Sequence, residues 1–500
     1  MRLRSALAAA AAALLTAGCA VGPNYVRPSA PVPPVFKEAP PGQRPEDWKA
    51  AQPSDAAPRG PWWEVFGDPD LDALEAAVDA ANQDVARAEA NYHVARALAR
   101  GARADLFPAL TVSPAVTIAR SRTGAGQATG TGTGGHTTVY EVPFDLSWEA
   151  DVFGRIRRNL ESNVAAAQAT AADLEGVRLS LHAELAMDWF LLQGLDAQKR
   201  LLDDAVAGYA RALQLNRNRH EQGIVSGVDV AQAETQLETT RVESTDLEVD
   251  RAQLEHAIAV LTGRPPADLT IPPTPIHAAP PAIPSLLPSE LLERRPDIAA
   301  AERRVAAANA QVGVATAAFF PRLLLAASAG WQNASLGSLF SAPSFFWSIG
   351  PSLAQTIFSG GRRRAALEQA HGNYDAAVAG YRQSALGAFQ EVEDGLAAQR
   401  ILGTEAEQEA VAVAASERLV AIARNRYQGG ITTYLEVVTA ETAALANRRS
   451  AVELLVRRMT TSVALVKALG GGWDASTLPS RGDVLSRVSP HPTATEGRIP

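Results

Sequence analysis

The chain has 500 residues, a formal net charge of −8 and a single cysteine. One thiol excludes an intramolecular disulfide and a four-thiolate metal site, and the 46 lysines and arginines form no run typical of a nucleic-acid surface. Hydrophobic residues make up 47% of the chain, but many are alanines and aromatic residues reach only 6%. This composition favours closely packed helices over one thick globular core.

The first residues have the features of a secretion signal. A start with two arginines precedes an apolar run at 6–15 that is too short to cross a bilayer as a stable helix. Small residues follow and end at Cys19, and this run resembles the lipobox of bacterial lipoproteins. The resemblance implies that residues 1–18 are a signal peptide and that Cys19 carries a diacylglycerol and an N-acyl chain such as palmitate. It also implies that Ala20, in place of an aspartate, directs the chain to the outer membrane.

Two segments at the ends of the mature chain lack periodic apolar positions. Residues 19–61 are rich in proline, and we expect them to form a lipidated, extended N-terminal segment that cannot pack by itself. Residues 474–500 follow the last periodic stretch and are predicted to be a flexible tail.

An internal repeat organises the residues between these segments. The stretch NRHEQGIVSGVDVAQAET begins at Asn218, and NRYQGGITTYLEVVTAET begins at Asn425, 207 positions later. DVARAE and DIAAAE, and two Phe-Pro pairs, correspond in the same order. We therefore predict a two-fold internal repeat, with a first unit at 62–270 and a second at 271–473.

Each unit is predicted to begin with a helix. Apolar residues and alanines step by three and four from Leu71 to Ala102 and again from Ile298 to Phe319, and both stripes stop at a Phe-Pro pair. Each unit also ends in two long helices joined by a glycine-containing turn. These hairpins, predicted at about 155–262 and 360–470, have the pattern of antiparallel coiled coils.

Strict alternation of apolar and polar residues lies between the first helix and the hairpin of each unit. The pattern predicts strands at about 109–122, 139–153, 322–333 and 345–358. Four aromatic residues are expected on the lipid-facing side of these strands: Tyr140, Trp148, Trp331 and Trp347. Four acids are expected on the lumen-facing side: Glu141, Asp145, Glu149 and Asp151. The acids either favour cations in a pore or only solvate the interior.

Four strands of this length have the dimensions of membrane-barrel strands but are too few to close. Unpaired backbone groups are costly in hydrocarbon, so the sheet must be shared between chains. Two chains would give about eight strands and a filled interior, and three would give about twelve strands and a lumen. The polar face favours the wider, water-filled option.

Several motifs in this order resemble the TolC-like outer membrane factors, in particular the lipoprotein (NodT-type) branch that serves RND-type efflux pumps. They are CAVGPNYVRP, PWWEVFGDPDLDALEAA, LLERRPDIAAAE, the two NR-x-x-x-G turns and KALGGGW. The resemblance runs from Cys19 to Trp473 and implies a mixed α/β membrane protein. Its expected fold is a homotrimer with an outer membrane β-barrel, four strands from each chain, continued by a long periplasmic α-helical coiled-coil barrel.

The resemblance also implies a function. The expected protein is the passive outer membrane duct of a tripartite efflux pump for drugs or other small molecules, as in multidrug resistance. It would dock a periplasmic adaptor protein and an inner-membrane RND transporter, and contact outer membrane lipid. Two alternatives stay open: a trimeric conduit for protein or siderophore export, and a non-conducting coiled-coil lipoprotein scaffold. A scaffold would have no use for barrel-length strands.

Motifs for catalysis and cofactor binding are absent from the sequence. The eight histidines show no metal-ligand spacing, and no phosphate-binding loop with a Gly-Lys-Ser/Thr ending occurs. Gly130, Gly132 and Gly135 fit a dinucleotide-binding pattern by letter, but they lie in a loop between two predicted strands. We therefore expect no enzyme activity, no cofactor other than the lipid on Cys19, and no nucleic-acid partner.

The helix-to-helix turns carry the remaining candidate residues. Ser226 with Asp229, and Thr433 with Glu436, have the spacing of a capping box. The family resemblance gives both acids a second, compatible role as carboxylates around the periplasmic aperture. Four turn residues are predicted to contact the adaptor: Gly223, Ser226, Gly430 and Thr433. Four residues before the turns either latch neighbouring helices or are ordinary residues of an exposed helix end: Arg219, His220, Arg426 and Tyr427.

Overall fold

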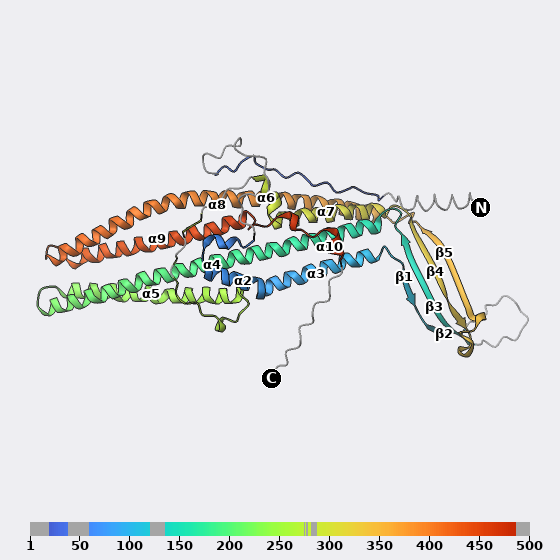
Figure 1. The fold of residues 1–500 in the computed structure, drawn as a ribbon, viewed down its shortest axis with the longest axis horizontal. Coiled ribbons are helices and arrows are strands. Elements are labelled where there is room, and N and C mark those ends of the chain that lie inside the picture. Colours follow the sequence, from blue (N-terminus) through green and yellow to red (C-terminus); the bar gives the residue numbers. More distant parts are fainter. Residues whose placement is uncertain are drawn as a thin grey trace, which may run out of the picture.

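The computed structural model describes residues 20–38, 60–120, 136–274, 276, 279–281 and 288–486. The chain is elongated, with a long helical part and a sheet that extends from one end of it (Figure 1). Among the described residues, no helix is both long enough and apolar enough to cross a bilayer.

Two helices of 67 residues, α4 (Arg155–Glu221) and α8 (Arg362–Gln428), run through the whole helical part (Figure 1). Each returns through a turn into a helix of 35 residues, α5 (Gly227–Leu261) after α4 and α9 (Tyr434–Ala468) after α8. The two hairpins lie side by side, because α9 packs against α4 as well as against α8. Neither long helix contains a proline, so its backbone hydrogen bonding continues from end to end.

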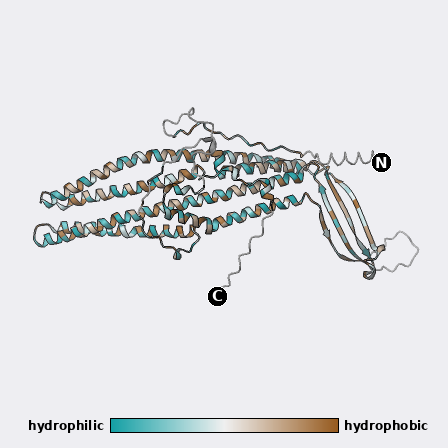
Figure 2. Cartoon of the chain, in the orientation of Figure 1, coloured by the Kyte–Doolittle hydropathy of each residue, from teal (hydrophilic) through white to brown (hydrophobic). Residues whose placement is uncertain are grey.

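Two helices of 22 residues complete the helical layer next to the sheet. α3 (Gln83–Ala104) packs on α4 beyond the end of α5, and α7 (Pro296–Ala317) lies between α4 and α8. The short α6 (Pro288–Arg294) precedes α7. In cross-section the layer therefore has α4 in an inner position and α8 at one edge. Figure 2 shows apolar and polar residues interleaved along every long helix, as expected for helices that pack along narrow stripes.

The first predicted helix is interrupted. The apolar stripe from Leu71 to Ala102 is divided between α2 (Pro69–Ala81) and α3, because Asn82 has an extended backbone. The Asn82 side-chain oxygen accepts hydrogen bonds from the N–H groups of Asp84 and Val85, at 2.8 and 3.1 Å. Asn82 is thus the N-cap of a new helix, which periodicity alone did not reveal.

The strands form one antiparallel sheet in the order β1–β3–β4–β5, with β2 also paired to β3. Their bounds are β1 Ala109–Val112, β2 Ala115–Arg120, β3 His136–Ala150, β4 Arg322–Asn333 and β5 Phe345–Ala354. The strand expected at 109–122 is divided at Ser113 and Pro114, because proline has no N–H to donate to the ladder. The strands expected to reach residues 153 and 358 end earlier, at Ala150 and Ala354.

The register gives the sheet one apolar and one polar face. Val142 pairs with Trp331, and Trp331 in turn pairs with Phe345. Three positions along, Asp145 pairs with Ser328, which pairs with Ser348. Directly paired residues point to the same side of a sheet, so the alternation seen in each strand adds up across all of them.

The described part of the N-terminal segment, residues 20–38, is extended and lies on the helices. The Val21 N–H donates to the Phe153 carbonyl at 3.1 Å, and the Lys37 N–H donates to the Glu393 side chain at 2.6 Å. Phe36 is buried in a cluster with Leu291 of α6 and residues of α8 and α9. The segment, which we expected not to pack by itself, is therefore packed against other parts of the chain.

The start of the predicted flexible tail has a defined structure. Residues 474–486 form a 3-10 turn, Ala475–Thr477, and a short helix, α10 (Arg481–Leu485), that packs on α3 and α4. Val484 is buried among residues of α3 and α4, and Arg96 donates to the Asp483 carbonyl at 2.8 Å. One buried valine was too weak a signal for periodicity to detect. Residues 487–500 lie outside the described residues.

Candidate functional site

The turn between α4 and α5 is closed by a capping box. Gly223 has a φ of 73° and ends α4, and the Ile224 N–H donates to the Arg219 carbonyl at 2.8 Å. The Asp229 side chain accepts from the Ser226 N–H at 3.0 Å, and the Ser226 hydroxyl accepts from the Asp229 N–H at 3.4 Å. Asp229 therefore fixes the first turn of α5.

The turn between α8 and α9 has the same backbone but different side-chain contacts. Gly430 has a φ of 69°, and the Ile431 N–H donates to the Arg426 carbonyl at 2.9 Å. The Thr433 side chain makes no capping hydrogen bond, so the box expected with Glu436 is not formed. The Glu436 carboxylate instead lies 3.8 Å from the Arg426 guanidinium of α8.

Two of the four predicted latch residues meet between the hairpins. The Arg219 guanidinium of α4 lies 5.1 Å from the centre of the Tyr427 ring of α8. The Tyr427 hydroxyl donates to the Asn216 side chain at 2.5 Å. His220 contacts its own turn, at the Val225 carbonyl, and Arg426 faces Glu436. Sequence reasoning missed Asn216, although a fully buried asparagine in an apolar helix stripe is an unusual position.

Three of the four predicted lumen acids lie on the polar face of the sheet. Glu141 and Asp145 point to this face by register, and so does Glu149. Asp151 does not belong to the sheet, since β3 ends at Ala150. Its carboxylate accepts from the N–H groups of Ile156 and Arg157 at 3.0 and 2.8 Å, so it caps the start of α4.

Glu149 is held by two cations at the junction of sheet and helices. Arg155 of α4 donates to both carboxylate oxygens at 3.0 Å, and Arg322 of β4 donates at 2.7 Å. The stacked rings of Phe153 and Phe320 lie in the segments that join β3 to α4 and α7 to β4, with centroids 4.8 Å apart. The negative charge of Glu149 is therefore offset locally, whereas Glu141 and Asp145 form no ion pair with any residue that the structure describes.

The four predicted aromatic residues share the apolar face of the sheet by register. Trp347 on the edge strand β5 is 70% exposed in the single chain. Trp331 packs edge-on against Phe340 and Phe345. Trp148 lies at the helical end of the sheet, where its indole N–H donates to the Leu106 carbonyl at 3.0 Å.

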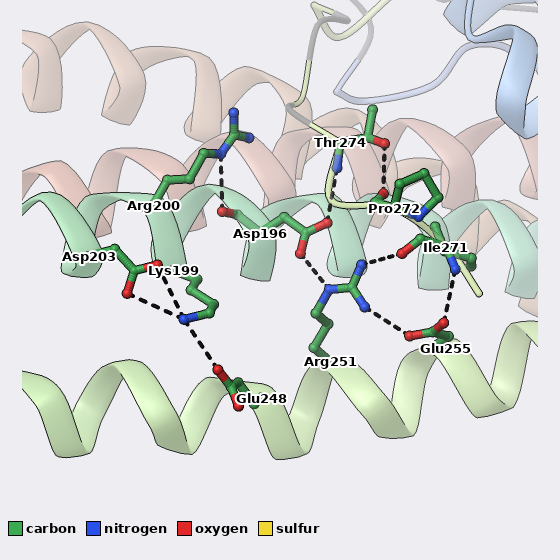
Figure 3. A network of polar contacts seen from close by, with 10 residues as sticks. All are labelled: Asp196, Lys199, Arg200, Asp203, Glu248, Arg251, Glu255, Ile271, Pro272 and Thr274. Carbon is green, nitrogen blue, oxygen red and sulfur yellow. Dashed lines mark hydrogen bonds and ion pairs between the residues drawn. The ribbon is translucent and has the colours of Figure 1, made fainter.

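A polar network that the sequence patterns did not single out joins the connector after α5 to the first hairpin (Figure 3). Arg251 donates to Asp196 of α4 at 2.6 Å and to the Ile271 carbonyl at 2.7 Å. Glu255 accepts from the Ile271 N–H at 2.9 Å. The connector is thereby fixed against α4 and α5 before it leads into the second half of the chain.

Cys19 lies outside the described residues, but the chain directly after it is placed. Ala20 lies against Gly154, where a Cβ on the glycine would be 2.8 Å from the Ala20 Cα. The next residue, Val21, is bonded to Phe153. The described chain thus begins at the junction between the sheet and α4. Among the described residues, no group of histidine and acidic side chains is arranged to hold a metal ion.

The sequence model of the family described as outer membrane efflux protein matches residues 77–264 and 287–471. The chain belongs to the outer membrane efflux protein family. Two curated relatives from Pseudomonas putida, the antibiotic efflux pump outer membrane protein ArpC and the toluene efflux pump outer membrane protein TtgC, are each 33% identical over 477 residues. These matches cover 95% of this chain and 97% of each relative.

The solved structure of the outer-membrane channel OprN superposes with a TM-score of 0.81 at 32% identity, over 91% of this chain and 100% of that one. The predicted relationship to the TolC-like outer membrane factors is confirmed, and so are the outer membrane location and the function as an efflux channel. The relatives of this outer membrane efflux protein are channels, not enzymes.

Proposed function

We propose that three copies of this outer membrane efflux protein form one closed, passive exit duct. The observation that carries the proposal is the open sheet. Its edges are β1 with β2 on one side and β5 on the other, and in the described residues neither edge has a further partner. An open edge beside an apolar face is unstable in hydrocarbon, so each edge needs the opposite edge of another copy.

Three copies fit this sheet better than two. Four strand positions per chain give about twelve strands in a trimer, which leaves a lumen, whereas about eight leave an interior that side chains fill. The face opposite the apolar residues bears Glu141, Asp145 and Glu149, and acids of this kind require water or cations around them. The polar face therefore supports the wider barrel and argues against a non-conducting scaffold.

The helical layer has complementary edges for the same arrangement. On α5, four valines are more than half exposed: Val228, Val242, Val249 and Val260. On α8, four apolar residues are at least half exposed: Ile401, Val411, Leu419 and Ile422. Apolar stripes of this kind on two opposite edges would be buried if α5 of one copy packed on α8 of the next. The barrel of strands would then continue as a coiled-coil barrel of helices.

The matched halves support the proposal that the chain is an internal duplication. The 67-, 35- and 22-residue helices each occur twice, once in each half. Each half contributes strands to the same sheet and one hairpin to the same tip (Figure 1). In a trimer, six similar hairpins would then surround one axis.

The hairpin tips are the proposed contact with the periplasmic adaptor, through which an inner-membrane RND transporter would be reached. Gly223, Ser226, Gly430 and Thr433 form the two turns at the end of the molecule remote from the sheet. Ile224 and Ile431 project from these turns and are 65% and 71% exposed. Exposed isoleucines at both tips support a protein partner there. The carboxylates of Asp229 and Glu436 would surround the aperture in the trimer.

The substrates are proposed to be drugs or other small molecules. ArpC is named for antibiotic efflux and TtgC for toluene efflux, although both are equally similar to this chain. Two relatives that are equally similar to this chain are thus named for chemically different substrates. We therefore propose that the transporter selects the substrates and that the duct only conducts them.

We further propose that Cys19 is the lipid attachment point. The position of Ala20 at the junction of sheet and helices supports this, because acyl chains on the preceding residue would lie beside the end of the sheet. Mass spectrometry of the mature N-terminus tests it. Three acyl chains on Cys19 are expected, and an unmodified N-terminus after residue 18 or elsewhere would contradict the proposal.

The duct itself is tested by native mass spectrometry and by planar-bilayer recording of the purified full-length protein. A mass of three chains and stepwise conductance are expected, with cation preference if Glu141 and Asp145 set the potential of the lumen. A mass of two chains would refute the twelve-stranded barrel. Trimers without conductance under any condition would support the scaffold alternative.

A further inference from the structure

The segment Trp62–Ala81 is fastened to α4 in a way that the duct function does not explain. It comprises the 3-10 turn η2 (Trp62–Phe66) and α2, and its side chains fill the main hydrophobic cluster of the first half. Asp68 accepts hydrogen bonds from the indole N–H of Trp189 at 2.8 Å and from Gln193 at 3.0 Å. The segment is therefore bound to α4 by polar contacts as well as by apolar packing.

A buried acid and a histidine make the central contact. Glu75 of α2 has 0% exposure, and its carboxylate lies 2.6 Å from Nδ1 of His182 on α4. Nε2 of His182 lies 3.3 Å from the carboxylate of Asp79, and the Trp63 ring stacks on the imidazole at 4.4 Å between centroids. The second oxygen of Glu75 has no hydrogen-bond partner. When Glu75 is ionised, no hydrogen-bond donor among the described residues stabilises the negative charge on this oxygen.

Burial and charge together determine how the pair binds protons. Burial raises the pKa of Glu75 to about 7, against the opposing effect of its hydrogen bond with His182. Burial alone would lower the pKa of His182, but the hydrogen bond and charge of Glu75, with the charge of Asp79, raise it overall. Both pKa values are therefore higher in the docked segment than in an undocked one.

Most of the other charged groups around the pair come from three helices, and two further acids, Glu293 of α6 and Asp474, line the same pocket as His182. Asp72 and Asp79 of α2 face it with negative charge. Arg178 of α4 lies next to Asp79 at 3.9 Å, but is also paired with Glu175 of α4 and Glu89 of α3, at 2.9 and 2.6 Å. The residues of α9 that pack into this cluster are apolar. The surroundings are thus predominantly acidic, which favours the proton-bound state of the pair.

The segment lies at the point along α4 where α5 ends and α3 begins. Asn82, directly after α2, donates to the Leu261 carbonyl at the end of α5 at 2.8 Å. A Cβ on Gly263 would lie 2.3 Å from the Ala81 carbonyl oxygen. α2 therefore holds together the end of α5 and the beginning of α3, the joint at which the first hairpin leaves the part next to the sheet.

The corresponding joint of the second half contains no such pair. At the offset of 207, His182 matches Phe389 of α8, and at the offset of 213 that relates DVARAE to DIAAAE, Asp79 matches Leu292. Phe389 is buried in an apolar cluster with Leu291, and Leu292 packs against that cluster. This joint is also anchored by the buried Arg295, which donates to Asp297, Glu391 and the Ala468 carbonyl. The first joint thus has an acid–histidine pair where the second has an apolar cluster beside an arginine.

We propose that Glu75 and His182 make the first joint a proton-dependent clamp, in which the segment Trp62–Ala81 docks tightly on α4 at acidic pH and loosens at alkaline pH. The sign follows from the raised proton affinity of both groups. The docked state binds more protons than the undocked state, so docking is favoured below the undocked pKa values and is weakened as pH rises through the docked ones. The second joint has no acid–histidine pair and is expected to remain unchanged, because the Arg295 that anchors it to Asp297 and Glu391 keeps its charge throughout this range.

Hydrogen exchange of the full-length protein, followed by mass spectrometry from pH 5.5 to 8.5, tests the clamp. Exchange in a peptide covering 69–81 is corrected for the intrinsic pH dependence and divided by that of a peptide covering 291–300. Relative protection of the first peptide is expected to fall about tenfold over this range, the equivalent of one pKa unit. A constant ratio in the wild-type protein would overturn the proposal without any variant.

A double variant, Glu75→Leu with His182→Phe, removes both titratable groups and introduces the residue type found at the matching position 389. Its relative protection is expected to be independent of pH. The exposed acid Asp70 at the start of α2 provides the matched control, and Asp70→Asn is expected to keep the full wild-type dependence. Persistence of the wild-type dependence in the double variant would assign it to other groups and refute the clamp.

Discussion

The long helices α4 and α8 have equal length and matching ends, but they occupy different places in the molecule. Of their 67 residues each, 27 are buried in α4 and 10 in α8, so the first is an inner helix and the second an edge helix of the same layer. Matching sequences therefore do not give matching environments. The difference shows that a single chain leaves much of the surface of α8 exposed, where another copy could cover it.

The two halves also differ in how they fix equivalent points. The first uses polar contacts, with His182 and Glu75 at its joint and Asp196 bound to Arg251 beside it (Figure 3). At the positions of His182 and Asp196 the second half has Phe389 and Gly403. The second half is anchored there by Arg295, which binds Asp297 and Glu391. A histidine in one joint and an arginine in the other would let the two hairpins respond differently to pH.

The largest expected effect comes from a charge on the exposed edge of α8. Val411 is 68% exposed in the single chain, and the matching position of α4 is Asp204. Val411→Asp copies that residue and should cost several kcal/mol per subunit contact if the next copy covers it. Native mass spectrometry is expected to show loss of trimer with unchanged helical circular dichroism. An intact trimer of wild-type stability would show that this edge is not an interface.

Matched core positions should behave alike in the two halves. Leu185 of α4 and Val392 of α8 correspond at the offset of 207, and both are buried. Leu185→Ala is expected to lower the free energy of unfolding by about 2–5 kcal/mol, and Val392→Ala by about 1–3 kcal/mol for its smaller side chain. Urea unfolding followed by circular dichroism measures both. A negligible effect at Val392 would mean that the second joint is not a packed core.

The glycines of the two tips should also be equally sensitive. Gly223 and Gly430 both have positive φ with no atom near a prospective Cβ, so alanine there meets backbone strain alone. Each alanine substitution is expected to destabilise its turn by about 1 kcal/mol. Hydrogen exchange in peptides covering 219–226 and 426–433 should rise by a similar factor. A strong effect at only one tip would reveal different backbone constraints.

The smallest expected effects separate the two tip acids. Asp229→Ala removes both bonds of a capping box and should destabilise the start of α5 by about 1 kcal/mol. Glu436→Ala removes only an exposed contact of 3.8 Å with Arg426, which contributes close to nothing. Local hydrogen exchange after each turn provides the comparison. An equal effect of the two substitutions would restore the capping role expected of Glu436.

Sequence patterns predicted the elements that depend on residues close together in the chain, namely the strands and the long helices. Alternation located the β-strands because each strand has one apolar face, and proline-free apolar stripes located the long helices. Asn82 and Pro114 show where this reasoning was incomplete. Asn82 interrupts a helix by making a capping hydrogen bond, and Pro114 interrupts a strand because it has no N–H to donate. A periodicity calculated over many residues does not detect the effect of one residue.

The candidate sites were predicted less fully, because their contacts join residues far apart in the chain. Asp151 continues the alternation of β3 but caps α4, since the strand ends one residue earlier. Thr433 and Glu436 have capping-box spacing, yet the box is not formed and Glu436 lies near Arg426 of the preceding helix. The spacing of residues in the sequence shows which contacts are possible. The residues that surround them in the fold determine which of these contacts form.

The sequence by itself determined the class of the protein, the order of its main elements and the glycines of its turns, because hydrophobic period, proline and glycine act within a few residues. Tertiary structure alone decided that α4 is inner and α8 outer, and that Glu75 meets His182 across 107 positions of chain. Such pairings depend on which helices become neighbours. That choice is made by packing the whole layer, so no short stretch of sequence contains it.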